Sequence, residues 1–237
     1  MHLMKCKILS DTFPAINKYP FNLNIFHKTK ILEFPGPVTF FVGENGTGKS
    51  TLLEAIAMRC DIHIWRVDER MRYEVNLFEQ DFYKYLDIQW DQVPGAFFAS
   101  EIFKDFAKLL DEWAVEDPGI LKYFGGHSLM TQSHGQSLMS FFKSRFKIKG
   151  LYLLDEPETA LSPQRQLELV RLLKDMTDDG HAQFIIATHS PLLMACPGAR
   201  IYSFDHKPIR QVDYEKTRHF KTYKKFLNSW KEYFKKG

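Results

Sequence analysis

The sequence predicts an α/β fold in which a mainly parallel sheet carries helices on its faces. Predominantly apolar runs at 38–43, 150–154 and 182–187 are typical of strands that are buried on both faces. Helical periodicity follows the first two runs, at about 48–57 and 162–180. Strands that alternate with helices along a chain favour parallel pairing, and this pattern indicates the fold class.

Composition and length are those of a globular protein. The chain has 237 residues, enough for a single large domain with a lobe inserted in it. A net charge of +3 gives no bulk signal for nucleic-acid binding. The chain has three cysteines, Cys6, Cys60 and Cys196. Their number is odd and their spacing does not fit a metal site, so we expect them to be reduced thiols. No signal peptide or apolar run of ~18–20 residues is present, so we expect a cytoplasmic protein without membrane insertion.

The first forty residues read as short strands that prolines interrupt, and we expect them to form an antiparallel subsheet beside the core. The buried strand at 38–43 leads directly into a helix from about Gly48. Four apolar residues share the inner side of that helix: Leu52, Leu53, Ile56 and Ala57.

Between about residues 60 and 146 the alternation of strands and helices is lost, which predicts an inserted, mainly helical lobe. Its clearest helix follows Ser100, a candidate N-cap, and ends before Pro118. Apolar residues recur there at helical spacing: Ile102, Phe103, Phe106, Leu109, Leu110 and Trp113.

After the lobe, regular order returns. The helix after the second buried strand has Ser162 as N-cap, Pro163 at its first position and Gly180 past its end. Two closing strands are expected at 199–205 and 209–214.

Residues 216–237 predict a C-terminal amphipathic helix. Its apolar stripe consists of Phe220, Tyr223, Leu227, Trp230 and Phe234. We expect this stripe to dock on the core with the lysines in solvent. The alternatives are a partner or nucleic-acid surface and, less favoured, a membrane-surface helix.

A phosphate-binding loop lies between the first buried strand and its helix. The segment fits G-x-x-x-x-G-K-[ST] at every fixed position, in the residues Gly43, Glu44, Asn45, Gly46, Thr47, Gly48, Lys49, Ser50 and Thr51. Glycines let successive backbone N–H groups turn toward one anion, and the helix start adds its positive end. Lys49 then contacts the β- and γ-phosphates, Ser50 ligates Mg²⁺ and Thr51 contacts the α-phosphate.

Two other strand ends carry the residues for hydrolysis. Adjacent carboxylates, Asp155 and Glu156, follow the second buried strand. In P-loop proteins the first acid holds Mg²⁺, and Glu156 would orient or deprotonate the attacking water. His189 ends the third buried strand, so we expect it beside the same γ-phosphate.

Together these residues resemble the ABC-type ATPases. Residues 43–51 look like their Walker A motif, 151–157 their Walker B motif, 160–163 their D-loop and 187–190 their switch-histidine segment. The segment 132–136, "QSHGQ", stands where the family has its signature motif. More narrowly, the chain looks like small stand-alone bacterial AAA/ABC ATPases related to the SMC and recombination-repair group.

The resemblance implies a P-loop NTPase fold and two composite ATP sites in a head-to-tail homodimer. Ser133, Gly135 and Gln136 match the family's signature and would contact the γ-phosphate held by the other subunit. Gln132 and His134 depart from it, and His134 places a side chain where the family usually has none.

Two positions of the family pattern stay open. The residue that joins the sheet to the lobe and senses Mg²⁺ is Glu101, Gln89 or Gln92, and the sequence favours Glu101. The aromatic residue against adenine is Tyr19 or Phe21.

These expectations define an ATP-binding, Mg²⁺-dependent ATPase. The favoured role is a regulatory or motor subunit of a DNA-repair or phage-defence system, beside a nuclease or other effector and with nucleic acid as a further partner. The alternative is the nucleotide-binding subunit of a membrane transporter, and a third is a binding switch with negligible turnover. The interval between Lys49 and Ser133 is too short for a long coiled-coil arm.

Overall fold

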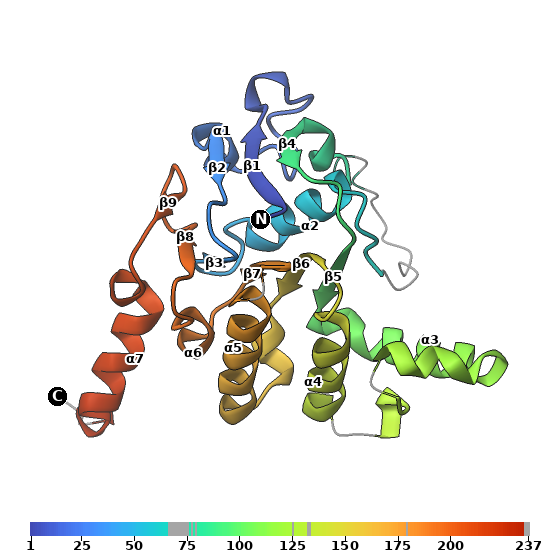
Figure 1. Cartoon of the computed structure of the whole chain (residues 1–237). Helices are drawn as coiled ribbons and strands as arrows, with labels where there is room; N and C mark the ends of the chain where they lie inside the picture. Colours follow the sequence, from blue (N-terminus) through green and yellow to red (C-terminus); the bar gives the residue numbers. More distant parts are fainter. Residues whose placement is uncertain are drawn as a thin grey trace.

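The computed structural model describes residues 1–65, 76, 78, 80–124, 126–131, 134–178 and 180–234, without the side chains of Lys104 and His134. Its strands form two sheets (Figure 1). The core sheet has the order β5-β6-β7-β3-β8-β9. Its strands are β3 (Val38–Val42), β5 (Gly95–Ala99), β6 (Gly150–Asp155), β7 (Ala182–Ala187), β8 (Arg200–Ser203) and β9 (Arg210–Gln211). All pairs are parallel except β8 with β9, which confirms the predicted mixed α/β fold.

The second sheet is antiparallel and has the order β2-β1-β4. Its strands are β1 (Leu3–Ile8), β2 (Ile31–Glu33) and β4 (Leu86–Trp90). In the central strand, Lys5 pairs with Glu33 on one side and with Gln89 on the other. The antiparallel N-terminal subsheet expected from the sequence is therefore present.

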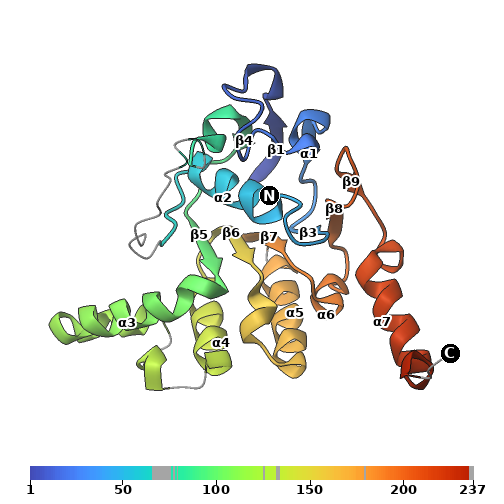
Figure 2. The same cartoon turned by 180° about the vertical axis from the view of Figure 1, so that it is seen from behind.

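The helices lie on both faces of the core sheet. The α-helices are α1 (Asn24–Lys28), α2 (Lys49–Arg59), α3 (Ser100–Glu116), α4 (His134–Arg145), α5 (Pro163–Asp178), α6 (Pro191–Met194) and α7 (Arg218–Ser229). Short 3₁₀ turns are η1 (Ser10–Thr12), η2 (Phe82–Tyr85), η3 (Pro118–Phe124), η4 (Leu129–Thr131), η5 (Pro157–Ala160), η6 (Tyr214–Lys216) and η7 (Trp230–Phe234). Seen from either side, α2 and the small sheet cover one face, and α4, α5 and α6 cover the other (Figures 1 and 2).

The core strands are apolar because both of their faces are covered. All five residues of β3 are buried, and so are all six of β7. Phe41 points into the core that α2 and the small sheet share, whereas Phe40 points into the core beneath α4 and α5. Full burial of each such side chain stabilises the fold by about 1.5–3 kcal/mol. Since β6, β7 and β3 run parallel, their carboxyl ends meet at one edge of the sheet.

The helical lobe is smaller than the sequence predicted. Within the expected interval of about 60–146, β4 pairs with β1 and β5 pairs with β6, so both belong to the sheets. The described helical part begins with α3 and ends with α4. Partners distant in the sequence set both pairings, and β4 has only partial burial, so no local pattern marked it.

The expected N-cap at Ser100 is wrong. Ser100 is the first residue of α3, and its hydroxyl donates to the Glu156 carbonyl oxygen at 2.8 Å. The side chain therefore ties the lobe to the turn after β6.

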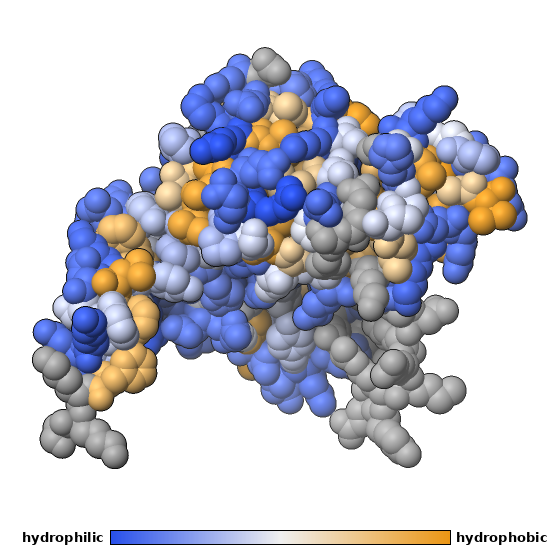
Figure 3. Space-filling view, turned by 90° about the horizontal axis from the view of Figure 1, so that it is seen from below, coloured by the Kyte–Doolittle hydropathy of each residue, from blue (hydrophilic) through white to orange (hydrophobic). Residues whose placement is uncertain are grey.

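The C-terminal helix does not dock its aromatic stripe on the core. Exposed fractions are 53% for Tyr223, 68% for Leu227 and 50% for Trp230, and the apolar side chains of this region gather on the surface (Figure 3). Only the first part of α7 is held, where Phe220 packs on Tyr214 with ring centroids 4.7 Å apart. The helix is strongly amphipathic as expected, but the distribution of hydrophobicity on one helix cannot show what covers it.

Over the described residues, every helix is too short or too polar to cross a lipid bilayer.

Candidate functional site

The phosphate-binding loop connects β3 to α2. Its glycines Gly43, Gly46 and Gly48 adopt φ values of 148°, 74° and 97°, a region that L side chains rarely enter. At Gly48 space is also limiting, because a Cβ there would lie 2.9 Å from the Phe26 ring. The loop therefore requires glycine both for its backbone conformation and for its packing on α1.

Lys49 folds back over this loop. Its Nζ donates to the carbonyl oxygens of Gly43 at 2.9 Å and Glu44 at 3.0 Å, and the residue is only 4% exposed. Burial lowers the pKa of Lys49, while nearby carboxylates, first Glu156 and then Asp155, oppose that shift. A buried ammonium group held by two carbonyls at a ring of backbone amides is suited to a phosphate.

Ser50 and Asp155 lie on different elements and are joined by a hydrogen bond. The Ser50 hydroxyl, in the first turn of α2, donates to Asp155 Oδ1 at the end of β6 over 3.0 Å. Burial raises the pKa of Asp155 to about 7, and the Ser50 hydrogen bond opposes that rise. A hydroxyl and one carboxylate are the donor set that Mg²⁺ uses when phosphates supply further ligands. No group of three or more His, Cys, Asp or Glu that could hold a metal exists among the described residues.

Glu156 has a left-handed backbone, with φ 44° and ψ 51°. For a residue with a Cβ this costs ~1–2 kcal/mol. Neighbouring hydrogen bonds hold the strained position: its N–H donates to the Ala187 carbonyl at 2.9 Å, and its carbonyl accepts from Ser100. The carboxylate stays part-exposed at the same edge as Asp155. Backbone strain of this kind is found most often at functional positions.

His189 follows β7 and lies beside Glu156. Its Nε2 is 3.4 Å from Glu156 Oε1, and its backbone N–H donates to Glu158 Oε1 at 2.5 Å. Burial, followed by the charge of Lys49, lowers the pKa of His189. Lys49, Ser50, Asp155, Glu156 and His189 therefore come together at the carboxyl ends of three neighbouring strands.

A cavity of about 560 Å³ opens at this edge. Ser50, Asp155, Glu156 and Glu101 are among the residues that line it. By contrast, Gln89 lies in β4, paired with Lys5.

Gln92, the other glutamine candidate, does not line the cavity that holds Ser50 and Asp155 either. Gln92 lines a different cavity, with Arg59 and Trp90. Of the three candidates for the position that joins sheet and lobe, only Glu101 lines the cavity with the paired carboxylates.

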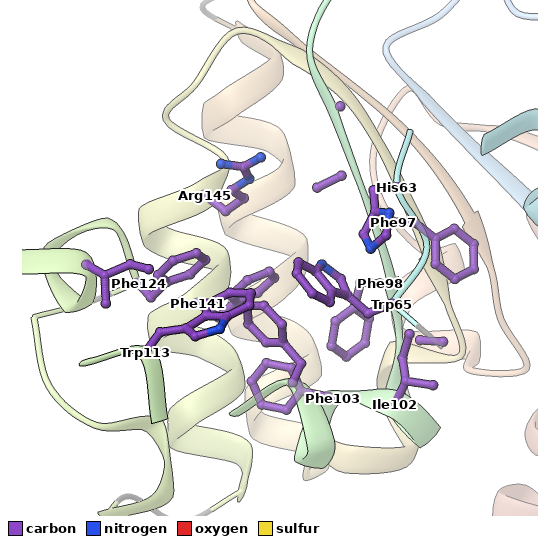
Figure 4. A pocket seen from close by; sticks show the side chains of 15 residues that line it. His63, Trp65, Phe97, Phe98, Ile102, Phe103, Trp113, Phe124, Phe141 and Arg145 are labelled. Atoms are coloured by element: carbon purple, nitrogen blue, oxygen red, sulfur yellow. The ribbon is translucent and has the colours of Figure 1, made fainter. Parts of the chain in front are cut away.

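A second, apolar cavity of about 230 Å³ separates β5 from the lobe (Figure 4). Aromatic side chains from both sides line it, among them Trp65, Phe98, Trp113 and Phe141. Trp65 and three neighbours also line the larger cavity, so the lobe contacts the site through these shared walls.

The two candidates for the residue that contacts adenine differ in their exposure to solvent. Phe21 is fully buried among Phe13, Phe82 and Tyr85, so it cannot stack on a base, and this candidate is wrong. Tyr19 is 39% exposed, and its hydroxyl lies 2.6 Å from Thr51 Oγ1 at the end of the loop.

Of the signature segment, Gln132, Ser133 and the His134 side chain lie outside the described residues. Gly135 and Gln136 lie in the first turn of α4. A Cβ on Gly135 would lie 3.3 Å from the Ala160 carbonyl oxygen, so this helix start abuts the predicted D-loop. The described residues of α4 do not line the cavity that holds Ser50 and Asp155.

Three further residues of the site were not predicted from the sequence. Glu158 holds the His189 backbone, Asp205 Oδ1 accepts the Glu44 N–H at 3.0 Å, and His219 Nε2 lies 3.1 Å from His189 Nδ1. Glu158 directly follows the Walker B-like segment 151–157. Asp205 follows β8 and His219 lies in α7, and only the tertiary fold brings them to the loop.

Comparison with protein families gives two matches. Residues 139–195 match a model described as "AAA domain, putative AbiEii toxin, Type IV TA system", and residues 21–60 match one described as "AAA domain". The second match includes the phosphate-binding loop, and the first includes both other strand ends of the site.

Curated relatives are ATP-binding proteins of transport systems. The chain is 26% identical over 206 residues to the nisin transport ATP-binding protein NisT of Lactococcus lactis, covering 75% of this chain and 32% of NisT. It is 25% identical over 193 residues to the glutamine transport ATP-binding protein GlnQ of Escherichia coli, covering 75% of this chain and 80% of GlnQ. The chain thus spans about a third of the length of NisT.

Among solved structures, the SMC head domain from Thermotoga maritima matches with a TM-score of 0.50 at 16% identity, covering 90% of this chain and all of that one. The SMC head bound to the C-winged helix domain of ScpA also gives 0.50, at 14% identity, covering 89% and 97%. Identities this low show a shared fold.

Proposed function

Because this chain is a P-loop ATPase domain of the AAA/ABC type, we propose that it hydrolyses Mg-ATP in sites formed by two copies of the chain. The observation that carries the proposal is the convergence of Lys49, Ser50, Asp155, Glu156 and His189 at one sheet edge. Each comes from a strand end or helix start that the parallel topology brings together.

The phosphates of ATP are bound by the loop amides of residues 43–51 and by Lys49. Ser50 and Asp155 would hold Mg²⁺, with Glu101 near its hydration shell, and the bound ion would neutralise phosphate charge. Glu156 accepts a proton from the attacking water. As the new oxygen–phosphorus bond forms, the bond to the β–γ bridging oxygen breaks, giving ADP and phosphate. His189 Nε2 faces the γ-phosphate, and Tyr19 lies on the adenine side.

The second half of each site comes from the other copy. The start of α4 lies against its own D-loop and contributes none of the described residues that line its own cavity. An exposed helix N-terminus binds anions through its free N–H groups. In a two-fold dimer, Ser133, Gly135 and Gln136 of one copy would meet the γ-phosphate on the other.

For the biological role, we favour an ATP-driven subunit of a cytoplasmic DNA-repair or phage-defence system with a nuclease or other effector. The family match described through a toxin of a toxin–antitoxin system supports this role. The transport relatives support the alternative, a transporter subunit. Neighbouring genes for a nuclease or for membrane spans would separate the two, and a pull-down with and without ATP would identify the partner. A phosphate-release assay would detect a switch without turnover.

The phosphate site is tested by Lys49→Ala. Removal of the buried ammonium should abolish ATP binding in isothermal titration calorimetry. The matched control is Lys174→Ala, an exposed lysine paired with Asp178 on α5, which should bind like the wild type. If Lys49→Ala bound ATP with unchanged affinity, the site assignment would be wrong.

A further inference from the structure

The ring of His189 lies between two polar side chains. On one side its Nε2 is 3.4 Å from the Glu156 carboxylate. On the other its Nδ1 is 3.1 Å from Nε2 of His219, in the first turn of α7. His219 is the point at which the C-terminal helix touches the predicted γ-phosphate side of the site.

These contacts favour one tautomer of His189. A lone pair on His189 Nε2 would face the Glu156 oxygen, which favours a proton on Nε2, but Nε2 has no hydrogen-bond partner among the described residues and this contact alone does not fix the tautomer. A neutral ring then carries a lone pair on Nδ1, which must accept a hydrogen bond. His219 Nε2 is the donor in position, and its own Nδ1 keeps the remaining lone pair without a partner among the described residues.

The start of α7 is held in place for this contact. Buried Thr217 caps the helix by accepting the Phe220 N–H at 3.2 Å, and the Tyr214 hydroxyl donates to the Pro191 carbonyl at 2.9 Å on α6. Arg218 adds an ion pair of 3.0 Å with Glu44 of the phosphate loop. Exposed pairs of this kind contribute little energy, so the cap and the Tyr214 bond fix the position of His219.

Both rings are neutral near pH 7. Burial lowers the pKa of both rings; the charge of Lys49 lowers the pKa of His189 further, whereas Asp205 and Glu44 partly oppose the lowering of the His219 pKa. The groups that face His219 are His189, Asp205, Glu44, Lys49 and Arg218. Two neutral imidazoles can share one hydrogen bond, whereas two protonated rings would place donor against donor.

We propose that His219 is a positioning residue that holds His189 in its Nε2–H tautomer, so that His189 presents a donor to the γ-phosphate. Because it concerns how His189 acts on ATP, this inference rests on the proposed function. Partner side chains of this type fix ring orientation and tautomer elsewhere in proteins. The first turn of α7 is thereby part of the ATP site, while the rest of the helix stays on the surface.

The direct test is the tautomer itself. In ¹⁵N-histidine-labelled protein without nucleotide, NMR of the ring nitrogens should show His189 with protonated Nε2 and bare Nδ1. In His219→Leu, the tautomers should become mixed. A wild-type His189 protonated on Nδ1, or a tautomer unchanged in His219→Leu, would overturn the proposal. This readout requires no ATPase activity, so it stands even if the proposed function fails.

The kinetic test compares two substitutions. Leucine removes the donor but keeps the bulk, whereas glutamine places an amide N–H near the position of Nε2. His219→Leu should lower kcat by roughly tenfold with KM for ATP close to wild type, and His219→Gln should restore most of it. His127→Leu, an exposed histidine of the lobe, is the control.

Thermal unfolding of each variant identifies a folding defect. If His219→Leu is unfolded, the kinetic test rests on His219→Gln alone. A tenfold lower kcat in a stably folded His219→Gln variant would contradict a donor role for His219. Equal kcat for wild type, leucine and glutamine variants would overturn the inference and leave the ATPase proposal intact. No turnover in the wild type would instead count against the proposed function.

Discussion

At the residue scale, the burial of Asp155 affects both the stability of the fold and the proposed function. Burial raises its pKa in the folded chain to about 7 from the ordinary value of 3.8, so the folded state binds a proton that the unfolded state has lost. Stability from this group is therefore complete below its unfolded pKa and is lost as the pH rises toward 7. The buried carboxylate that we propose as a Mg²⁺ ligand should therefore destabilise the metal-free protein at neutral and higher pH.

Asp155→Asn should accordingly raise the thermal midpoint in the presence of EDTA and without nucleotide. The gain should be larger at pH 8 than at pH 5, because only at the higher pH is a buried charge removed. Thermal denaturation followed by circular dichroism at both pH values measures it. An equal or smaller gain at pH 8 would show that Asp155 is not held in a site that disfavours its charge.

At the element scale, the C-terminal helix gives a result opposite to the sequence expectation, and stability can check it. Leu227 and Trp230 are 68% and 50% exposed, so little apolar area is lost to solvent when they are truncated. Leu227→Ser should change the free energy of unfolding by less than about 0.5 kcal/mol. Phe142→Ala, at a fully buried position, should cost about 3–5 kcal/mol.

Urea denaturation of the isolated protein measures both variants. A loss in Leu227→Ser that approached the loss in Phe142→Ala would mean that the stripe packs on the core as the sequence expected. The exposed stripe leaves a partner or nucleic-acid surface and, less favoured, a membrane-surface helix as the remaining interpretations for α7.

The same contrast shows what sequence can predict here. Runs such as 38–43 and 182–187 predicted strands because burial on both faces leaves a local, nearly continuous apolar pattern. The loop from Gly43 to Thr51 was predictable because phosphate binding fixes residue types at fixed spacing. By contrast, β4 is half-exposed and is defined by pairing with β1, and His219 reaches His189 only through the path of α7. Contacts between distant segments leave no local pattern to read.

At the scale of the whole molecule, the proposed function requires a second copy of the chain to complete the site. The sheet edge provides the loop, the Ser50–Asp155 pair, Glu156 and His189, whereas the start of α4 lies against Ala160 and none of the described residues of α4 lines the cavity. On this proposal, a monomer would bind ATP through one half of the site. If the second half comes from another copy, ATP favours the dimer by its differential affinity for the closed state, and loss of the γ-phosphate removes that preference.

Glu156→Gln should trap this closed state. The substitution removes the base that accepts the proton from water but keeps the side chain's shape, so ATP binds and persists. With ATP and Mg²⁺, size-exclusion chromatography with light scattering should give about twice the monomer mass, and omission of ATP should return the monomer. The double variant Lys49→Ala with Glu156→Gln should stay monomeric, because it lacks the ammonium that holds the phosphates. If Glu156→Gln remained monomeric at saturating ATP while calorimetry showed the nucleotide bound, the composite site would be wrong and hydrolysis would have to be completed within one chain.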